Sequence, residues 1–289
     1  MDVMARIERS LHEAVSQADN PGCPPRLAAA MRHAVFPRGA RIRPRLCLAV
    51  AAACGEDAPA VSEAAAIAIE LLHCASLVHD DLPCFDDAET RRGRSSVHRA
   101  FGEPLAVLAG DALIVLAFQA LAQGTACAPL RLAPLVLTIG MSVGVPCGIV
   151  AGQAWECEPD ADLALYQREK TGALFAAATV AGAAAAGADG APWRAVGATL
   201  GEAFQVADDI LDATSSAEAL GKPVGQDLAH ARPSAVRQLG LEGAIDRLEE
   251  LARSAVAAVP PCRGQSELRS HILTETSRLL PQSLARRAA

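Results

Sequence analysis

The chain has 289 residues, a formal net charge of −7 and a hydrophobic share of 51%. This acidic balance, without a basic stripe, argues against a nucleic-acid partner, because such proteins replace phosphate counterions with clustered lysine and arginine. Aromatic residues make up only 3%, so a core must come from alanine, leucine, valine and isoleucine. Their 3.6-residue spacing predicts an all-α protein, and the lack of linkers or repeats predicts a single domain over residues 1–289.

The predicted elements follow one another closely. The charged, amphipathic N-terminus (Met1 to Ala14) is expected to be a helix rather than a signal peptide. Further helices are predicted over 26–35, 46–54, 60–82, 104–123, 132–150, 160–168, 171–187, 192–213 and 235–258, with a polar loop over 214–233 and a last helix ending near 280.

Two uncharged stretches resemble membrane spans. Residues 132–155 are interrupted by glycine and proline, and residues 171–188 are mostly alanine and glycine, so we expect buried helices and no stable membrane insertion. The nine cysteines show neither a CxxC pair nor a zinc spacing. They are expected to be reduced core residues of a cytoplasmic protein.

Residues 79–94 place charged side chains directly after a long apolar run. The aspartates are Asp80, Asp81, Asp86 and Asp87, and the arginines are Arg91, Arg92 and Arg94. Carboxylates this close repel one another unless cations neutralise them, and Mg²⁺ suits because it is shared between a few carboxylates and substrate phosphates. Arginines offer forked donors for the same phosphates.

On a regular helix Asp80 and Asp86 would lie about 120° apart. Pro83 lacks a backbone N–H, so we expect the helix to end near it and the following loop to bring the two aspartates together. Taken alone, a solvated acidic loop explains this stretch equally well.

A second acidic set consists of Asp208, Asp209 and Asp212, with Gln205 one turn before Asp209. On a helix the three aspartates lie at roughly 0°, 100° and 40° and so share a face. A polar stripe on a surface helix is the alternative. Together, the two sets are expected to face each other across a helical bundle and to hold two or three Mg²⁺ ions against one diphosphate.

These motifs, in this order, resemble the polyprenyl synthetase family of trans-isoprenyl diphosphate synthases. They are GARIRP (39–44), LLHCASLVHDDLPCFDDAETRRG (71–93), LAGDAL (108–113), EKTGALF (169–175), FQVADDILD (204–212) and GKPVGQD (221–227). The similarity runs from about Gly39 to Ser234. With GARIRP and AGQAWE (151–156), the chain is most like bacterial geranylgeranyl diphosphate synthases of carotenoid and bacteriochlorophyll pathways.

The resemblance implies a helical bundle around a deep central pocket, usually a homodimer, that condenses isopentenyl diphosphate with an allylic diphosphate. It implies metal binding by Asp80, Asp81, Asp86, Asp208, Asp209 and Asp212. Residues that hold the allylic diphosphate or shelter the cation would be Arg91, Lys170, Thr171, Gln205 and Lys222. Residues that hold isopentenyl diphosphate would be Arg43, His73 and Arg92.

The sequence departs from the family pattern at two positions. The lysine of the family's GGKRxRP motif is Ala40 here, so Arg38 or Arg41 is expected to compensate for the lost charge. A second downstream lysine is replaced by Arg232, which keeps the charge but not its point geometry. Both acidic motifs are complete, so catalysis is expected to be retained.

The expected product is the twenty-carbon geranylgeranyl diphosphate, made with farnesyl diphosphate as the last primer. Ala75 and Ser76, five and four residues before Asp80, are small where shorter-chain synthases often place an aromatic floor, so the chain should extend toward Leu72. Alternatives are a farnesyl diphosphate synthase, a non-catalytic subunit of a heteromeric synthase, a class I terpene cyclase and, from His79 beside Asp80, an HD-type phosphohydrolase. A cyclase would carry an Asn/Ser/Glu set at Asp208, and a phosphohydrolase would need further histidines.

Overall fold

The structure is a computed structural model, and it describes residues 2–36, 39–155, 157–159, 172–214 and 234–279. The N-terminal helices are α1 (Val3–Val15), α2 (Pro25–Val35), α3 (Ile42–Cys54), α4 (Pro59–Asp80), α5 (Val97–Phe101) and α6 (Glu103–Gly124). The later ones are α7 (Leu132–Val143), α8 (Ile149–Trp155), α10 (Ala173–Ala185), α11 (Arg194–Thr214), α14 (Ala235–Ala257) and α15 (Gln265–Ser277). Short 3-10 turns are η1 (Ser16–Asp19), η2 (Pro129–Arg131) and η4 (Ala191–Trp193).

Proline and glycine set several helix ends. Pro25, Pro59 and Pro104 lie in the first turns of α2, α4 and α6. A missing backbone N–H costs little there, because those donors have no partner within the helix. Gly55 ends α3 in the left-handed conformation, with φ of 90°.

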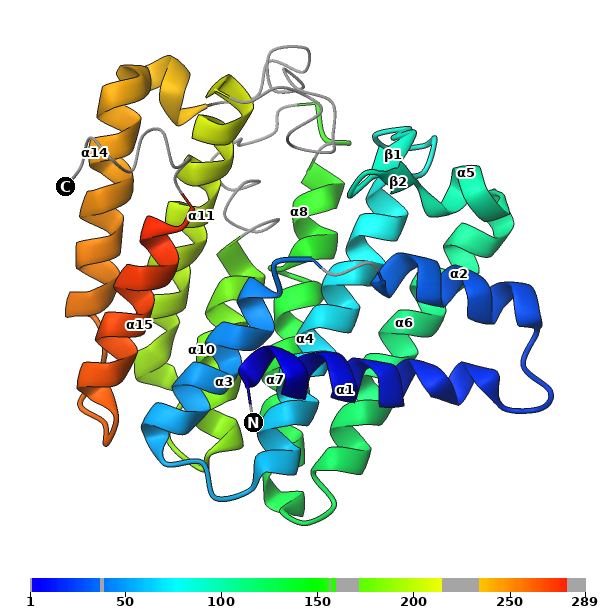
Figure 1. The fold of residues 1–289 in the computed structure, drawn as a ribbon, viewed down its shortest axis with the longest axis horizontal. Helices are drawn as coiled ribbons and strands as arrows, with labels where there is room; N and C mark the ends of the chain where they lie inside the picture. The colour runs from blue at the N-terminus through cyan, green and yellow to red at the C-terminus, as the bar shows by residue number, and fades with distance from the viewer. Residues whose placement is uncertain (1, 37–38, 156, 160–171, 215–233, 280–289) are drawn as a thin grey trace.

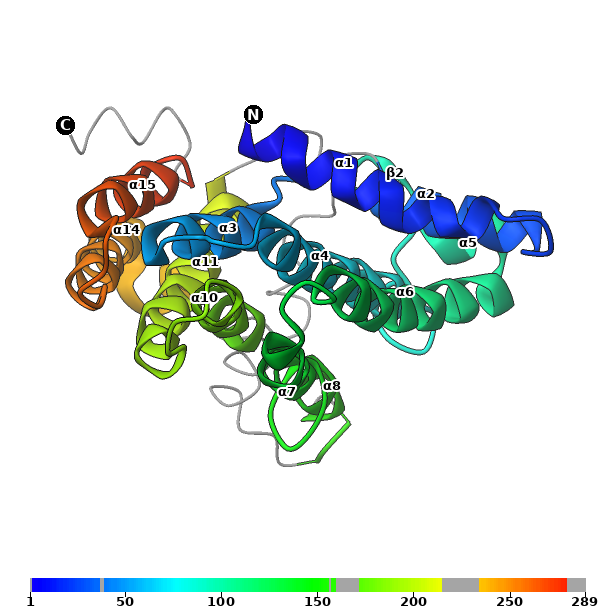
Figure 2. The ribbon, with the colours of Figure 1, turned by 90° about the horizontal axis from the view of Figure 1, so that it is seen from below.

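Helix α4 lies at the centre of the bundle, where it packs against α3, α6, α7 and α10. In Figure 1, the carboxyl ends of α4 and α11 lie at the same end of the bundle, the upper one in this view. Helices α1 and α2 lie across the outer side of α4 and α6, which is clearest from below (Figure 2).

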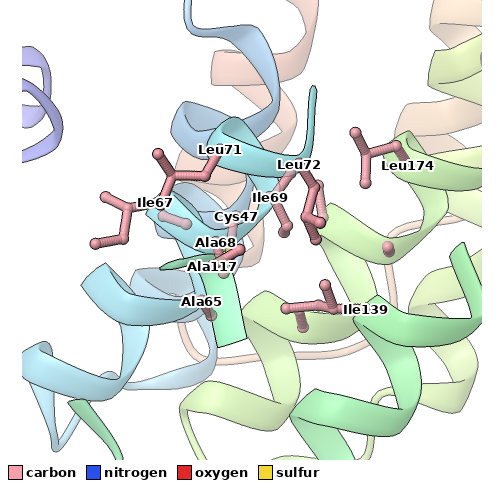
Figure 3. Close-up of a cluster of buried hydrophobic side chains, with 14 of the residues drawn as sticks. Cys47, Ala65, Ile67, Ala68, Ile69, Leu71, Leu72, Ala117, Ile139 and Leu174 are labelled. Carbon is pink, nitrogen blue, oxygen red and sulfur yellow. The ribbon is translucent and has the colours of Figure 1, made fainter. Parts of the chain in front are cut away.

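The main core is built largely from alanine and aliphatic side chains of α1 to α11. Figure 3 shows Ile67 and Leu71 on one side of α4, and Leu72 on the side that faces Ile139 of α7 and Leu174 of α10. A smaller apolar cluster joins α11 to α14. The core therefore fixes the end of α4 relative to α10 and α11.

Among the described residues, two helices, α4 and α6, are long and apolar enough to cross a membrane by length and composition. In α4, 78% of the apolar window is buried inside the protein, as expected for a core helix. In α6 only 44% is buried.

The all-α expectation is confirmed, apart from a small antiparallel hairpin of β1 (Thr90–Arg91) and β2 (Arg94–Ser95). The continuous helix predicted over 132–150 is wrong, because the chain leaves the helix after Val143 and re-enters it at Ile149. Gly148 has φ of 139° there. The helix predicted over 160–168 lies outside the described residues.

The cysteines are all free thiols, as expected, but only some lie in the core. Cys47 and Cys74 are buried, whereas Cys84, Cys127 and Cys157 are exposed. The expectation of a core position is therefore wrong for these three, which occupy surface positions that hydropathy does not reveal.

Candidate functional site

The first acidic motif folds back onto the end of α4. The helix ends at Asp80, three residues before Pro83, as the sequence predicts. The backbone N–H of Asp86 then donates to the carbonyl of Asp80 at 3.0 Å, and the N–H of Ala88 donates to the carbonyl of Asp81 at 3.2 Å. The loop thus brings Asp86 beside Asp80, which a continuous helix would keep apart.

Asp81 is the buried aspartate of this motif, and its carboxylate is paired with Arg91. Its carboxylate accepts hydrogen bonds from Nε of Arg91, at 3.0 Å, and from Nη2 of the same side chain. Burial raises the pKa of Asp81, although Arg91 acts in the opposite direction. Asp80 is only half-buried and Asp86 is exposed.

The β1–β2 hairpin directs two arginines to different places. Arg92 and Gly93 form its turn, with φ of 53° and 72°, the positive values of a tight hairpin connection. Arg91 reaches Asp81, whereas the guanidinium of Arg92 lies so close to Gly39 that a Cβ there would meet its Cζ at 2.8 Å. The sequence analysis missed this hairpin, although the glycine after two arginines is a turn signal.

Arg43 lies in the first turn of α3 and is held by aromatic rings and a histidine. Its Cζ is 4.5 Å from the ring centroid of Phe175 and 5.6 Å from that of Phe204, distances typical of cation–π contacts. Its Nη1 is 3.4 Å from Nε2 of His73. Burial, opposed in part by Glu70, lowers the pKa of Arg43 to about 10.

Arg43, His73 and Arg92 form a group, called the cation cluster below, that fits an anionic ligand. Nε of Arg43 is buried and has no hydrogen-bond acceptor among the described residues, although buried donors are normally paired. Burial, then the charges of Arg43 and Arg92, lower the pKa of His73 well below 6.5, so the imidazole is neutral at pH 7. The structure therefore brings together all three residues predicted for isopentenyl diphosphate.

The second acidic set lies on α11. Gln205 donates to Oδ1 of Asp209 at 3.0 Å, as its spacing suggests. Oδ2 of Asp209 accepts the backbone N–H of Ala235 at 2.7 Å, in the first turn of α14. Asp209 is buried, whereas Asp208 and Asp212, one turn apart, are partly exposed.

The ends of α4 and α11 that carry these sets lie at the same end of the bundle (Figure 1). Within the described ranges, no three acidic, histidine or cysteine side chains already form a ready-made metal site.

Comparison with known proteins identifies the family. The sequence profile of polyprenyl synthetases matches residues 24–260. The chain belongs to the polyprenyl synthetase family. It is 53% identical, over 98% of both chains, to a geranylgeranyl diphosphate synthase of Cereibacter sphaeroides. It is also 53% identical to one of Rhodobacter capsulatus, over 93% of both chains.

Solved structures of related polyprenyl synthetases share the fold. A geranyltransferase from Helicobacter pylori, complexed with magnesium and isoprenyl diphosphate, superposes with a TM-score of 0.78 at 28% identity, covering 96% of this chain and 98% of its own. An FPP/GFPP synthase from Zymomonas mobilis gives 0.78 at 29% identity, covering 95% and 98%.

The donor chemistry of this polyprenyl synthetase fits magnesium. Asp80 and Asp86 at one motif, and Asp208 and Asp212 at the other, offer hard oxygen donors that are at least partly exposed. Magnesium keeps several waters and binds through one or two carboxylates plus substrate phosphates. Asp81 accepts hydrogen bonds from Arg91, and Asp209 accepts them from Gln205 and the backbone of Ala235, so part of their lone pairs is already used within the protein.

Of the two arginines expected to compensate for the lysine missing at Ala40, the structure directs Arg41 to other partners. The guanidinium of Arg41 is fully buried, and its donors are taken up by Glu8, Glu70 and the carbonyl of Val35. Ala40 itself is exposed. Arg38 lies outside the described residues. The remaining predicted site residues outside the described ranges are Lys170, Thr171, Lys222 and Arg232.

The predicted chain-length residues lie on α4 before the acidic motif. Leu72 and Ala75 are each 1% exposed, and Oγ of Ser76 donates to the carbonyl of His73 at 2.9 Å. A recess that is partly open to solvent lies between α7, α10 and α11 and reaches Gln205. Its lining does not include the three chain-length residues.

Proposed function

We propose that this chain is a magnesium-dependent geranylgeranyl diphosphate synthase. It condenses isopentenyl diphosphate with an allylic diphosphate, with farnesyl diphosphate as the last primer, and releases geranylgeranyl diphosphate and diphosphate. The observation that carries the proposal is the buried Arg43 cluster, with an unpaired donor among the described residues, close to the acidic end of α4. The names of the relatives from Cereibacter sphaeroides and Rhodobacter capsulatus support the product.

The cation cluster holds isopentenyl diphosphate in this proposal. Two phenylalanine rings orient the guanidinium of Arg43, and His73 and Arg92 complete the cluster. Such preorganised donors hold a diphosphate in place and present the double bond of the substrate to the allylic carbon.

The allylic diphosphate binds between the two acidic sets. Residues proposed to surround it are Arg91, Lys170, Thr171, Gln205 and Lys222, with Arg232 as a further cation. When bound, two or three Mg²⁺ ions neutralise the charge that grows on the leaving diphosphate. The allylic C–O bond breaks, the isopentenyl double bond attacks the allylic cation, and the released diphosphate accepts the proton that then leaves.

The small side chains before the acidic motif support a twenty-carbon product. We infer that a growing chain can pass the small side chains of Ala75 and Ser76, where an aromatic side chain would block it. A chain growing along α4 advances about one helical turn per isoprene unit, since a turn rises ~5.4 Å. Leu72, one turn further, is the proposed limit.

The protein is proposed to be soluble and to form a homodimer through α6. Val107, Leu108 and Val115 are 41%, 51% and 57% exposed on this helix. An apolar face of this kind on a helix as long as α6 marks an association surface. Sedimentation of the wild type should give twice the 29.8 kDa chain mass, and Val115→Glu should lower it.

Product analysis tests the proposed activity. Purified protein is incubated with Mg²⁺, labelled isopentenyl diphosphate and dimethylallyl, geranyl or farnesyl diphosphate in turn, and products are separated by chain length. We expect the twenty-carbon product from each primer. Accumulation of the fifteen-carbon product, or no elongation of farnesyl diphosphate, would contradict the proposal. An Asp208→Ala preparation controls for host enzymes.

A further inference from the structure

Arg41 adopts a backbone conformation that is rare for a residue with a side chain. It precedes α3 with φ of 51° and ψ of 37°, in the left-handed region. Its side chain is completely buried and makes three bonds to three different parts of the chain. Nε donates to Glu8 of α1 at 3.0 Å, Nη1 to Glu70 of α4 at 2.6 Å, and Nη2 to the carbonyl of Val35 at 2.9 Å.

The turn at Arg41 lies between two parts of the cation cluster. Gly39, two residues before it, packs against the guanidinium of Arg92. Arg43, two residues after it, contacts His73 and the phenylalanine rings. The conformation at Arg41 therefore sets the positions of both neighbours, and the three bonds of its side chain hold that conformation.

Glu70 links the same turn to the cluster by charge. It lies one turn before His73 on α4 and raises the pKa of Arg43, which burial lowers. Glu8 lies on α1, which Figure 2 shows on the outer side of the bundle, and it accepts a hydrogen bond from Nε of Arg41.

We propose that Glu8 is a positioning residue for isopentenyl diphosphate, which acts by holding Arg41 and thereby the turn that carries Gly39 and Arg43. This inference rests on the proposed assignment of Arg43, His73 and Arg92 to that substrate. Glu8 touches no substrate. Loss of Glu8 loosens the turn, so the guanidinium groups of Arg43 and Arg92 no longer hold their donors in one fixed arrangement.

When Glu8 is replaced, the positioning role and a direct substrate-binding role of Arg41 predict opposite changes in the KM for isopentenyl diphosphate. If Arg41 bound the diphosphate, releasing it from Glu8 would free a cation and lower the KM for isopentenyl diphosphate. If Glu8 positions the turn, the same change raises that KM, because a displacement of about 1 Å is enough to cost binding and rate.

The test is Glu8→Gln, with KM measured separately for isopentenyl and farnesyl diphosphate, together with kcat and the melting temperature. We expect the KM for isopentenyl diphosphate to rise about tenfold and that for farnesyl diphosphate to stay within about twofold. A merely structural role would lower kcat through loss of folded enzyme and leave both KM values unchanged. Glu13→Gln, at a 70% exposed position of the same helix, is the matched control and should have no effect.

Two further variants keep the test decisive. Arg41→Lys retains a positive charge but loses the fork that bonds three partners, so it should raise the same KM. An unchanged KM in Arg41→Lys overturns the inference. If Glu8→Gln does not fold, Glu8→Asp, which keeps the charge but shortens the reach, should show the same selective rise.

Arg43→Gln separates the inference from the proposed function. If Arg43→Gln raises the KM for isopentenyl diphosphate and Glu8→Gln does not, the positioning role is wrong and the binding site stands. If neither raises it, both are wrong. A selective rise in both supports both.

Discussion

Replacing Gly39 with alanine tests the cation cluster with one added methyl group. The new Cβ would lie 2.8 Å from Cζ and Nη2 of Arg92 and 3.1 Å from its Nη1. Ordinary contacts begin near 3.4 Å, so the guanidinium must retreat by about 0.6 Å or more. Because this group ends a flexible side chain, the fold should accommodate the change at little cost in stability.

The cost should appear in substrate binding instead. A hydrogen bond to a charged group contributes about 1.5–3 kcal/mol. If the displaced Arg92 loses its contact with isopentenyl diphosphate, the KM for that substrate should rise by up to roughly 10- to 150-fold, since each 1.4 kcal/mol is about a factor of ten. The KM for farnesyl diphosphate should hardly change.

Initial rates with labelled isopentenyl diphosphate at saturating farnesyl diphosphate, and the reverse titration, measure both constants. Gly140→Ala is the matched control, because a Cβ there meets nothing within 4 Å outside its own helix. An equal rise for both substrates in Gly39→Ala, or no rise for isopentenyl diphosphate with Arg92 visibly displaced, would refute the reasoning.

Asp208→Ala should reduce kcat by at least about 10²-fold, because groups that stabilise developing charge contribute about 2.7–4 kcal/mol; activity within tenfold of wild type in the folded variant would be inconsistent with a metal ligand. Asp81→Asn should cost activity and also lower the melting temperature, since it breaks the buried pair with Arg91; a change in activity alone would point to a purely catalytic role. Ala75→Phe should shift the product toward fifteen carbons with the first condensation largely intact, and unchanged twenty-carbon product would show that Ala75 is not the floor. The pKa of His73 is lowered in the folded state, so unfolding takes up a proton and stability falls as the pH drops below about 6.5. Measured by urea unfolding, His73→Gln should remove up to ~1.4 kcal/mol per pH unit of that loss. Equal slopes of the unfolding free energy against pH in wild type and variant would contradict this.

Much of the helical frame could be predicted because its signals are local. Proline and glycine fix helix ends, so α6 was expected over 104–123 and is Glu103–Gly124. The return of Asp86 to Asp80 followed from Pro83 in the same way. The break between α7 and α8 was not predicted, because apolar residues continue across it at helical spacing although glycines lie between them.

The parts that sequence reasoning missed depend on distant partners. Arg41 looked like a substitute for a lost lysine, but its carboxylate partners lie 33 and 29 positions away in the chain, on α1 and α4. Asp209 shared a predicted face with Asp208, yet its carboxylate reaches the first turn of α14. No local pattern pairs such residues, since only the packed helices bring them together.

The central claim is that the cation cluster binds isopentenyl diphosphate and the two acidic motifs bind the allylic diphosphate. Equilibrium binding of the two substrates with and without Mg²⁺ tests this claim. Labelled isopentenyl diphosphate should bind with nearly the same Kd in EDTA as in Mg²⁺, because its donors are Arg43, His73 and Arg92. Farnesyl diphosphate should lose at least about tenfold in affinity when the metal is removed, because its diphosphate would face carboxylates directly. Isopentenyl diphosphate binding that needs the metal as much as farnesyl diphosphate does would contradict the account.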